Sequence, residues 1–367
     1  MEESAILLQA IQDELDRFMD DRQAEFDTIS GDLSPIIDYT RDLLRGGKRF
    51  RALFCYWSWI GNLENPATAQ SQQALASIVK ICAALEMFHA AALVHDDLID
   101  QSDTRRGKPA IHKRFEELHK SQHWAGAPER LGAAGSILVG DLMLSWSSEL
   151  FGSALLDAPS REIEAACRDE FGRMRVEVMA GQYLDVLEEN AAPSRPISEG
   201  VDRANRVMLF KTAKYSIEAP LLIGAAFAGA SSKKRHTLSN FAIPLGLAFQ
   251  MRDDVLGVYG DPSVTGKPAG DDLREGKRTV LVALAREILE GKVAELFDQM
   301  LTATDIGPEQ IAVMQQTIIG TGALKKTETM ITELGNESLV ALDALELDGE
   351  AKAQLRKLAN LVMNRES

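Results

Sequence analysis

The chain has 367 residues, of which 45% are hydrophobic and 26% are charged, a composition typical of soluble globular proteins with a large core. The 55 acidic residues exceed the 40 basic residues, and the formal net charge of −15 argues against a general nucleic-acid-binding surface. Cys55, Cys82 and Cys167 are odd in number and have apolar neighbours, so we expect buried thiols and neither disulfides nor a zinc site.

The beginning of the chain gives no indication of export or membrane attachment. Residues 1–22 are acidic with helical spacing of apolar residues, and they lack the basic flank of a signal peptide and the Arg/Ser bias of a transit peptide. The uncharged stretches at residues 219–232 and 237–251 are shorter than the roughly 18–20 apolar residues that span a bilayer. We therefore expect a cytoplasmic protein with no nucleic-acid partner and no stable membrane anchor.

Apolar residues recur at intervals of three and four along nearly the whole chain, which predicts an all-α fold. Pro244 should kink its helix without ending it, because the apolar pattern resumes at Leu245. Glycine and proline clusters mark breaks between helices, chiefly at residues 61–68, 107–109, 126–128, 189–196 and 257–270. No linker separates two bodies, so residues 1–367 are predicted to form one domain, a large helical bundle with a central cavity.

The first acidic motif is Asp96-Asp97-x-x-Asp100, which follows an uncharged apolar stretch. Asp96 and Asp100 share one face of a helix, where like charges are destabilising unless a cation lies between them. Carboxylates with open coordination positions suit Mg²⁺, which is commonly shared with substrate phosphates. Arg105 and Arg106 follow at once and can bind such an anion. The alternative is a solvated acidic turn.

A second acidic motif contains Gln250, Asp253 and Asp254 and also follows an apolar stretch. A glycine-rich loop that carries Lys267 then leads to Lys277. A third element, residues 45–51, is basic and precedes a helix, where backbone N–H groups favour anions. Two acidic helix ends, each followed by basic residues, predict metals and phosphates held between opposed helices.

The order of these motifs resembles the trans-type isoprenyl diphosphate synthases, the head-to-tail polyprenyl synthetases, and most of all the geranylgeranyl diphosphate synthases. The matching motifs are Gly-Gly-Lys-x-x-Arg at 46–51, Asp-Asp-x-x-Asp at 96–100 with Arg-Arg-Gly at 105–107, Lys-Thr at 211–212, Phe-Gln-x-x-Asp-Asp at 249–254 and Gly-Lys-x-x-Gly at 266–270. The likeness runs from about residue 43 to residue 282, roughly two thirds of the chain.

The resemblance implies a role for individual residues. Three Mg²⁺ ions would bind the allylic diphosphate through Asp96, Asp100 and Asp253, with Asp97 nearby. The basic residues implied to hold the same diphosphate are Arg105, Lys211 and Lys267. The isopentenyl diphosphate pocket would be formed by Lys48, Arg51, His89 and Arg106. The oxygens of Thr212 and Gln250 would face the allylic cation, and Lys277 is a further candidate for substrate binding.

The implied activity is the Mg²⁺-dependent condensation of isopentenyl diphosphate with dimethylallyl, geranyl or farnesyl diphosphate, carried out by a homodimer. Two other functions are weighed against it. A class I terpene cyclase shares the bundle and the first acidic motif but needs no isopentenyl pocket. A non-catalytic subunit of a two-component synthase loses an aspartate motif, whereas this chain has both.

Product length is predicted from one stripe of the helix that ends in the first motif. Phe88, Ala92 and Asp96 are spaced by four, and bulky residues four and five positions before the first Asp stop growth at fifteen carbons in the family. Ala91 and Ala92 are small and leave room for a longer chain. Phe88, about 12 Å below Asp96, is therefore the candidate floor, that is, the side chain that stops growth of the prenyl chain. This favours the C20 product geranylgeranyl diphosphate. A farnesyl or a longer product of C25 and above is the alternative, with residues 140–144 as another possible limit.

The second motif departs from the family pattern once. The family commonly has a third Asp where this chain has Gly257. Since the next acidic residue along the chain is Asp261, a ligand assignment at that end of the motif is weakened, but Asp253 is unaffected. Asp141 and the pair Gln182 and Asp185 lie where family members carry residues facing the metals, with structural contacts equally expected.

Overall fold

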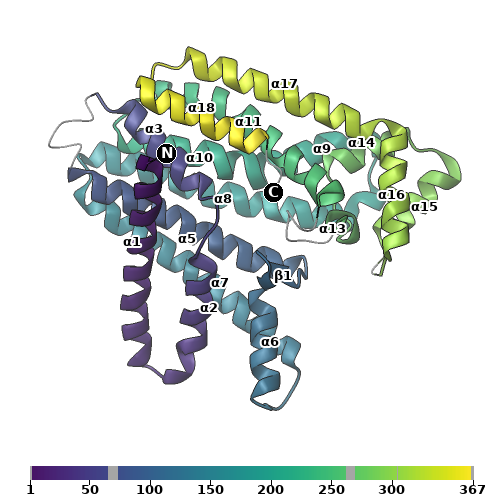
Figure 1. Cartoon of the computed structure of the whole chain (residues 1–367), viewed down its shortest axis with the longest axis horizontal. Coiled ribbons are helices and arrows are strands. Elements are labelled where there is room, and N and C mark those ends of the chain that lie inside the picture. The colour runs from purple at the N-terminus through teal and green to yellow at the C-terminus, as the bar shows by residue number, and fades with distance from the viewer. Residues whose placement is uncertain (1, 65–72, 262–268, 304, 365–367) are drawn as a thin grey trace. The chain divides into compact units, whose positions relative to one another are not determined.

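Figure 1 shows the computed structural model of the chain, which describes residues 2–64, 73–261, 269–303 and 305–364. The predicted all-α fold is confirmed, since the described residues are helical apart from loops and one pair of two-residue strands. The chain divides into two compact units. Unit 1 consists of Met1–Tyr56 and Leu63–Glu164, and unit 2 consists of Trp57–Asn62 and Ala165–Ser367.

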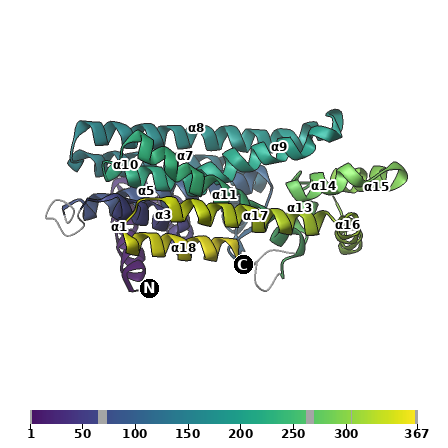
Figure 2. The same ribbon diagram turned by 90° about the horizontal axis from the view of Figure 1, so that it is seen from above.

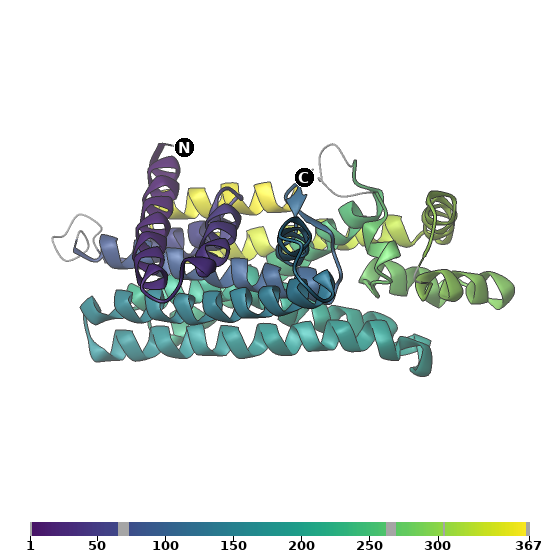
Figure 3. The same ribbon diagram turned by 90° about the horizontal axis from the view of Figure 1, so that it is seen from below.

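Unit 1 is built around the buried helix α5. Its elements are α1 (Glu2–Asp27), η1 (Gly31–Leu33), α2 (Ser34–Leu44), the first half of α3 (Phe50–Asn62), α5 (Leu75–Ile99), β1 (Thr104–Arg105), β2 (Lys108–Pro109), α6 (Ile111–Ser121), α7 (Pro128–Ala154), η2 (Leu155–Asp157) and the first turn of α8 (Arg161–Ala191). Helix α5 packs mainly against α7 and also contacts α1. Helices α1 and α2 form an antiparallel pair, drawn in purple in Figure 3.

Helix α5 is largely apolar and is mostly buried in the protein. Ile78, Ile81, Met87 and Phe88 are buried, and small residues such as Ala84 allow the neighbouring helices to approach closely. Among the described residues it is the one helix long and apolar enough to cross a membrane, but 72% of its most apolar window is buried in the protein. Such burial is typical of a core helix, so the feature is weak evidence for a membrane span.

Unit 2 is built around α11. Its elements are the second half of α3, most of α8, η3 (Ala192–Ser194), η4 (Ile197–Glu199), α9 (Gly200–Val207), the π-helix η5 (Met208–Glu218), α10 (Ala219–Phe227), α11 (Ser232–Tyr259), α13 (Asp271–Arg274), α14 (Val280–Ile288), α15 (Gly291–Leu301), α16 (Pro308–Thr321), α17 (Ala323–Ala344) and α18 (Gly349–Met363). Pro244 lies inside α11, so the prediction that this helix continues is confirmed. Helices α17 and α18 lie side by side, as the yellow ribbons in Figure 2 show.

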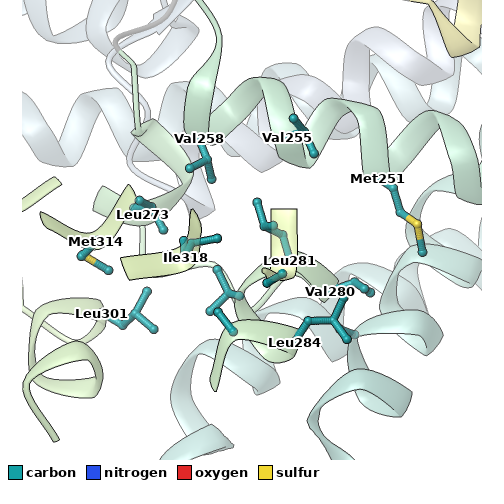
Figure 4. Packing of buried hydrophobic residues seen from close by; sticks show 14 of the residues in the cluster. Met251, Val255, Val258, Leu273, Val280, Leu281, Leu284, Leu301, Met314 and Ile318 are labelled. Carbon is teal, nitrogen blue, oxygen red and sulfur yellow. The ribbon is translucent and has the colours of Figure 1, made fainter. Parts of the chain in front are cut away.

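The core at one end of unit 2 fixes the last turns of α11. Val255 and Val258 of α11 pack with Leu273 of α13, Leu281 of α14 and Ile318 of α16 (Figure 4). This apolar cluster holds the C-terminal turns of α11 and the short helix α13 together. Acidic residues carried by these two helices are thereby kept close to one another.

Three details of the sequence analysis are settled by the fold. The three cysteines are buried free thiols, as predicted. The break predicted at residues 107–109 is a β-hairpin, in which Thr104 pairs with Pro109 and Arg105 with Lys108. Arg106 and Gly107 both have positive φ values (54° and 72°), as a two-residue primed turn requires.

Candidate functional site

The first acidic motif lies at the C-terminal end of α5. Asp97 is buried and accepts a hydrogen bond of 2.8 Å from Arg105 Nε and a second one from Arg105 Nη2. The same guanidinium group is 3.8 Å from Asp96 Oδ2. Asp96 and Asp100 are half-buried, and Asp100 caps the helix. Asp97 is therefore neutralised by Arg105, while Asp96 and Asp100 keep part of their carboxylate surface accessible.

The hairpin after α5 and the loop after α2 together form a basic region in unit 1. Arg106 Nη1 donates a hydrogen bond of 3.0 Å to the carbonyl oxygen of Leu43. Its Nη2 lies so close to Gly47 that a Cβ at that position would be 2.9 Å away. Gly47 also has φ +85°, a backbone conformation that favours glycine. Lys48, the next residue, is exposed.

His89 faces this basic region from α5. Burial, followed by the positive charges of Arg51, Arg106 and Arg105, holds the pKa of His89 well below its usual range. The imidazole is therefore neutral at pH 7 and can donate or accept a hydrogen bond. The structure thus brings together four residues predicted for diphosphate binding, namely Arg51, His89, Arg105 and Arg106.

Glu86 is a residue of this region that the sequence analysis missed. It is one turn before His89 on α5 and accepts a hydrogen bond of 3.3 Å from the backbone N–H of Ala52. Burial raises its pKa, and the charges of Arg51, Arg49 and Arg106 counteract that rise. A single acidic residue within an otherwise uncharged apolar stretch was the available indication, because buried charges are seldom found without partners.

The residues predicted to set product length lie on α5 as expected. Phe88 and Ala91 are buried with exposed fractions of 1% and 0%, and Ala92 is half-buried. Ala92 is one helical turn and Phe88 two turns before Asp96, so the small residue lies between the acidic motif and the phenyl ring.

In unit 2, Lys211 and Thr212 lie on η5, which is a π-helix where the sequence predicts only a regular helix. A Cβ on Gly246 of α11 would lie 2.5 Å from Ala213 Cα, and one on Gly181 of α8 would lie 2.6 Å from the Phe210 carbonyl carbon. Glycines on two helices therefore let the backbone of η5 approach closely from both sides. π-helical turns are rare in proteins, and those that occur often lie at functional sites.

A chain of hydrogen bonds fixes the polar side chains of η5 and α11. The Thr212 hydroxyl donates to Gln250 Oε1 (2.6 Å), and Gln250 Nε2 donates to Asp254 Oδ1 (2.7 Å). Lys211 Nζ, on the neighbouring residue of η5, donates to Asp185 Oδ2 at 2.5 Å. The contact that the sequence analysis left open for Asp185 is therefore an ion pair with a predicted diphosphate-binding lysine.

These side chains line an open cavity of about 510 Å³ in unit 2, counting the space at its mouth. Lys211, Thr212, Gln250, Asp253 and Lys277 were predicted site residues, and the structure brings all five together here. The cavity is also lined by Asp185, for which the sequence left two roles open, by Asp254 of the second motif, and by Asp272, which was not a predicted site residue. Lys267 lies outside the described residues.

The carboxylates of this cavity repel one another. Burial, followed by the charges of Asp272 and Asp253, raises the pKa of Asp254 well above its usual range, against the lowering effects of the Gln250 hydrogen bond and of Lys277. Lys277 Nζ is 3.8 Å from Asp272 and 2.7 Å from Glu275. The second motif therefore stands in a region of concentrated negative charge that a cation would stabilise.

The donor atoms of both motifs fit magnesium. Asp96 and Asp100 in unit 1, and Asp253 in unit 2, offer carboxylate oxygens, the hard ligands that this ion prefers. Within the described parts of the chain, no group of three or more His, Cys, Asp or Glu residues is arranged as a preformed metal cage. Magnesium does not need such a cage, because one or two carboxylates, waters and substrate phosphates usually complete its shell.

Comparison with known proteins identifies the family. The family model described as Polyprenyl synthetase matches residues 33–318. The chain is 30% identical to geranylfarnesyl diphosphate synthase of Aeropyrum pernix over 87% of its length and 91% of that protein. It is also 30% identical to geranylgeranyl diphosphate synthase of Methanosarcina mazei, over 80% of both chains.

A crystal structure of geranylgeranyl pyrophosphate synthase from Corynebacterium glutamicum, complexed with isoprenyl diphosphate and magnesium, has the same fold. It superposes with a TM-score of 0.90 and 38% sequence identity, over 98% of each chain. The family model, the relatives and this structure agree with the motifs that the sequence analysis identified. The chain belongs to the polyprenyl synthetase family and is a prenyltransferase that makes prenyl diphosphates.

Proposed function

We propose that this enzyme makes the C20 product geranylgeranyl diphosphate from isopentenyl diphosphate and the allylic substrates dimethylallyl, geranyl and farnesyl diphosphate. The observation that carries the product length is the stripe on α5, where Ala92 and then the buried ring of Phe88 follow the first motif. A chain that grows past Ala91 and Ala92 would meet Phe88 about 12 Å below Asp96.

The proposed diphosphate site combines both motifs. Asp96 and Asp100 of the first motif and Asp253 of the second would hold magnesium, with three ions proposed for the allylic diphosphate. When bound, the ions supply Lewis-acid stabilisation to the leaving diphosphate. Arg105, Lys211 and Lys267 hold the same oxygens, and Lys277 lines the cavity close to them.

The first step is ionisation of the allylic diphosphate, in which the C1–O bond breaks and both electrons leave with pyrophosphate. The cationic side chains stabilise the negative charge that develops, which is the largest single contribution expected for such a reaction. The allylic cation is faced by the oxygens of Thr212 and Gln250. Their hydrogen bond to each other, and that of Gln250 to Asp254, supports this role because it fixes the orientation of the amide.

The second step is attack by the C3–C4 double bond of isopentenyl diphosphate on the cation. A proton is then lost to the departed pyrophosphate. Lys48, Arg51, His89 and Arg106 bind the diphosphate of this substrate. A neutral His89 among three arginines supports the assignment, because it adds a hydrogen-bond donor without a further positive charge.

The proposed enzyme is a cytoplasmic homodimer. An apolar stripe on α8 supports the dimer, since Val176, Met179 and Tyr183 share one helix face and are exposed by 71%, 41% and 66%. Size-exclusion chromatography with light scattering tests it: wild-type chain is expected at twice the mass of a Tyr183→Glu variant. A wild-type monomer would contradict the dimer.

The full chain tests the activity. Purified protein is incubated with labelled isopentenyl diphosphate, each allylic diphosphate in turn and Mg²⁺, and the dephosphorylated products are separated by chromatography. We expect Mg²⁺-dependent incorporation that ends at C20. Products of C15, or of C25 as in the Aeropyrum relative, would overturn the proposed length, and hydrocarbon release without isopentenyl diphosphate would indicate a cyclase.

Two substitutions on α5 test the floor. Phe88→Ala should lengthen the main product to C25 or more, and Ala92→Phe should shorten it to C15. Phe115→Ala is the matched control, because Phe115 is a buried ring on α6 and not on the stripe. If Phe88→Ala leaves the product spectrum unchanged while Ala92→Phe shortens it, the stripe is correct and Phe88 is not its floor.

A further inference from the structure

Gly257 of α11 marks a difference between the two acidic motifs. In the first motif, Asp96 has a partner carboxylate one helical turn later, at Asp100. In the second motif, the residue one turn after Asp253 is Gly257, which has no side chain. Glycine inside a helix costs about 1 kcal/mol relative to alanine, so its presence here calls for a packing reason.

The packing reason is Asp272. A Cβ on Gly257 would overlap the carboxylate of Asp272, with Oδ1 at 2.8 Å and Oδ2 closer still. Asp272 comes from α13, whose start is set by Gly270 in the left-handed conformation (φ +75°). The side chain is 16% exposed and lines the same cavity as Asp253. The space above Gly257 is therefore occupied by a carboxylate from another helix.

We propose that Asp272 acts as the second carboxylate of the magnesium site formed by Asp253, in the place of the side chain that Gly257 lacks. This inference rests on the proposed role of Asp253 as a ligand. Asp253 and Asp272 then form the pair that Asp96 and Asp100 form within one helix. The sequence conceals this pair, because its second member comes fifteen residues after Gly257.

A purely structural role for Asp272 is the competing explanation. Its carboxylate is 3.8 Å from Lys277 Nζ and could serve only to hold that lysine. Asp271 offers a matched control, because it lies on the same short helix, is 17% exposed and is 3.3 Å from its own partner Arg274. Asp271 is not among the residues that line the cavity.

Magnesium binding separates the two explanations without measuring turnover. The full-length protein is titrated with Mg²⁺ in the presence of inorganic pyrophosphate, and the melting temperature or the heat of binding is recorded. For Asp272→Asn we expect the half-saturating Mg²⁺ concentration to rise at least about tenfold, as for groups that support a metal site. Asp271→Asn should bind like wild type.

Asp253→Asn makes the two proposals distinguishable. If it weakens Mg²⁺ binding while Asp272→Asn does not, the inference about Asp272 is wrong and the ligand role of Asp253 stands. If neither variant changes binding, the proposed metal site at the second motif fails. A Lys277→Met variant that reproduces the whole effect of Asp272→Asn would show that the carboxylate only holds the lysine.

Moving the carboxylate back to α11 is the strongest test. Gly257→Asp alone should weaken Mg²⁺ binding and stability, because the new side chain collides with Asp272. In the double variant Gly257→Asp/Asp272→Ala, Mg²⁺ binding should recover at least fivefold over Asp272→Ala. Gly257→Ala/Asp272→Ala controls for relief of the collision and should show no recovery. A double variant no better than Asp272→Ala would overturn the inference.

Discussion

The two acidic motifs carry similar residues in different electrostatic settings. In the first, the buried Asp97 is paired with Arg105, and two half-buried aspartates remain for a cation. In the second, the buried Asp254 is close to two further carboxylates, and its pKa is raised. The first motif thus carries its own counter-ion within the fold, whereas the second depends more on a cation that binds from solution. The same short sequence pattern therefore does not determine how the charge is balanced.

The largest effect on activity is expected from the aspartates that both motifs offer to magnesium. Asp96→Asn and Asp253→Asn each remove a proposed metal ligand and should lower kcat/KM by about 10³, the scale of several kcal/mol of lost transition-state stabilisation. Steady-state incorporation of labelled isopentenyl diphosphate at saturating Mg²⁺ measures it. Asp103→Asn is the control, since Asp103 is exposed and pairs with Lys113 at 3.2 Å. A loss below tenfold in either variant would remove that residue from the metal site.

The next largest effect concerns Arg105, the counter-ion of the buried Asp97 in the first motif. Arg105→Ala leaves the buried carboxylate of Asp97 without its partner and should lower the free energy of unfolding by about 3–5 kcal/mol. Denaturation in urea measures this change. The double variant Asp97→Asn/Arg105→Ala should regain most of the stability but not the activity. If the double variant is as unstable as the single one, the ion pair is not what holds this region.

A smaller effect concerns the π-helix beside the second motif. Gly181→Ala should cost about 1–3 kcal/mol of stability, because the new methyl group meets the backbone of Phe210 and Lys211. Lys211 would move with that backbone, so we also expect a rate loss of about tenfold, the equivalent of 1.4 kcal/mol. Gly172→Ala on the same helix meets nothing within 4 Å and should be stabilising instead. Equal behaviour of the two variants, by urea denaturation and product assay, would argue against close packing at Gly181.

The smallest effect is a change in melting temperature that should have opposite signs when the buried aspartate of each motif is replaced. Asp254→Asn removes a buried charge that has carboxylate neighbours and should raise the melting temperature without Mg²⁺ by roughly 1 °C, the shift that about 1 kcal/mol gives in a chain of this length. Asp97→Asn should lower it, because Arg105 loses its partner. The folded-state pKa of Asp254 lies above its unfolded value, so the charge costs stability above that folded pKa. The gain from Asp254→Asn should therefore shrink as pH falls from 8 toward 4, and a gain that grows instead would contradict the assignment.

Helical periodicity and motif order were sufficient to predict the fold class and the family, whereas the roles of the individual site residues stay predictions. Arg51, Lys211, Gln250 and Asp253 could be proposed because each is part of a short motif, and His89 could be proposed from the family resemblance alone. The proposed single domain, and the meeting of both motifs in one site, stay predictions.

What could not be predicted depends on contacts between distant segments. The π-helix at Lys211 is accompanied by close approach of Gly181 and Gly246, which belong to two other helices. Asp272 reaches Gly257 only after the chain has left α11 and started α13. Neither close approach can be recognised from residue spacing in the sequence, because neither follows the period of a single helix.

The burial of most of α5 has a consequence for synthesis of the chain on the ribosome. Its main packing partner, α7, ends at Ala154, well after α5 itself has been made. Until then the nascent polypeptide exposes a long hydrophobic segment, which chaperones can bind and which is prone to aggregation. Fragments that terminate between Ile99 and Pro128 should accordingly be insoluble, and strong pausing of translation in that interval would reduce the yield of active enzyme.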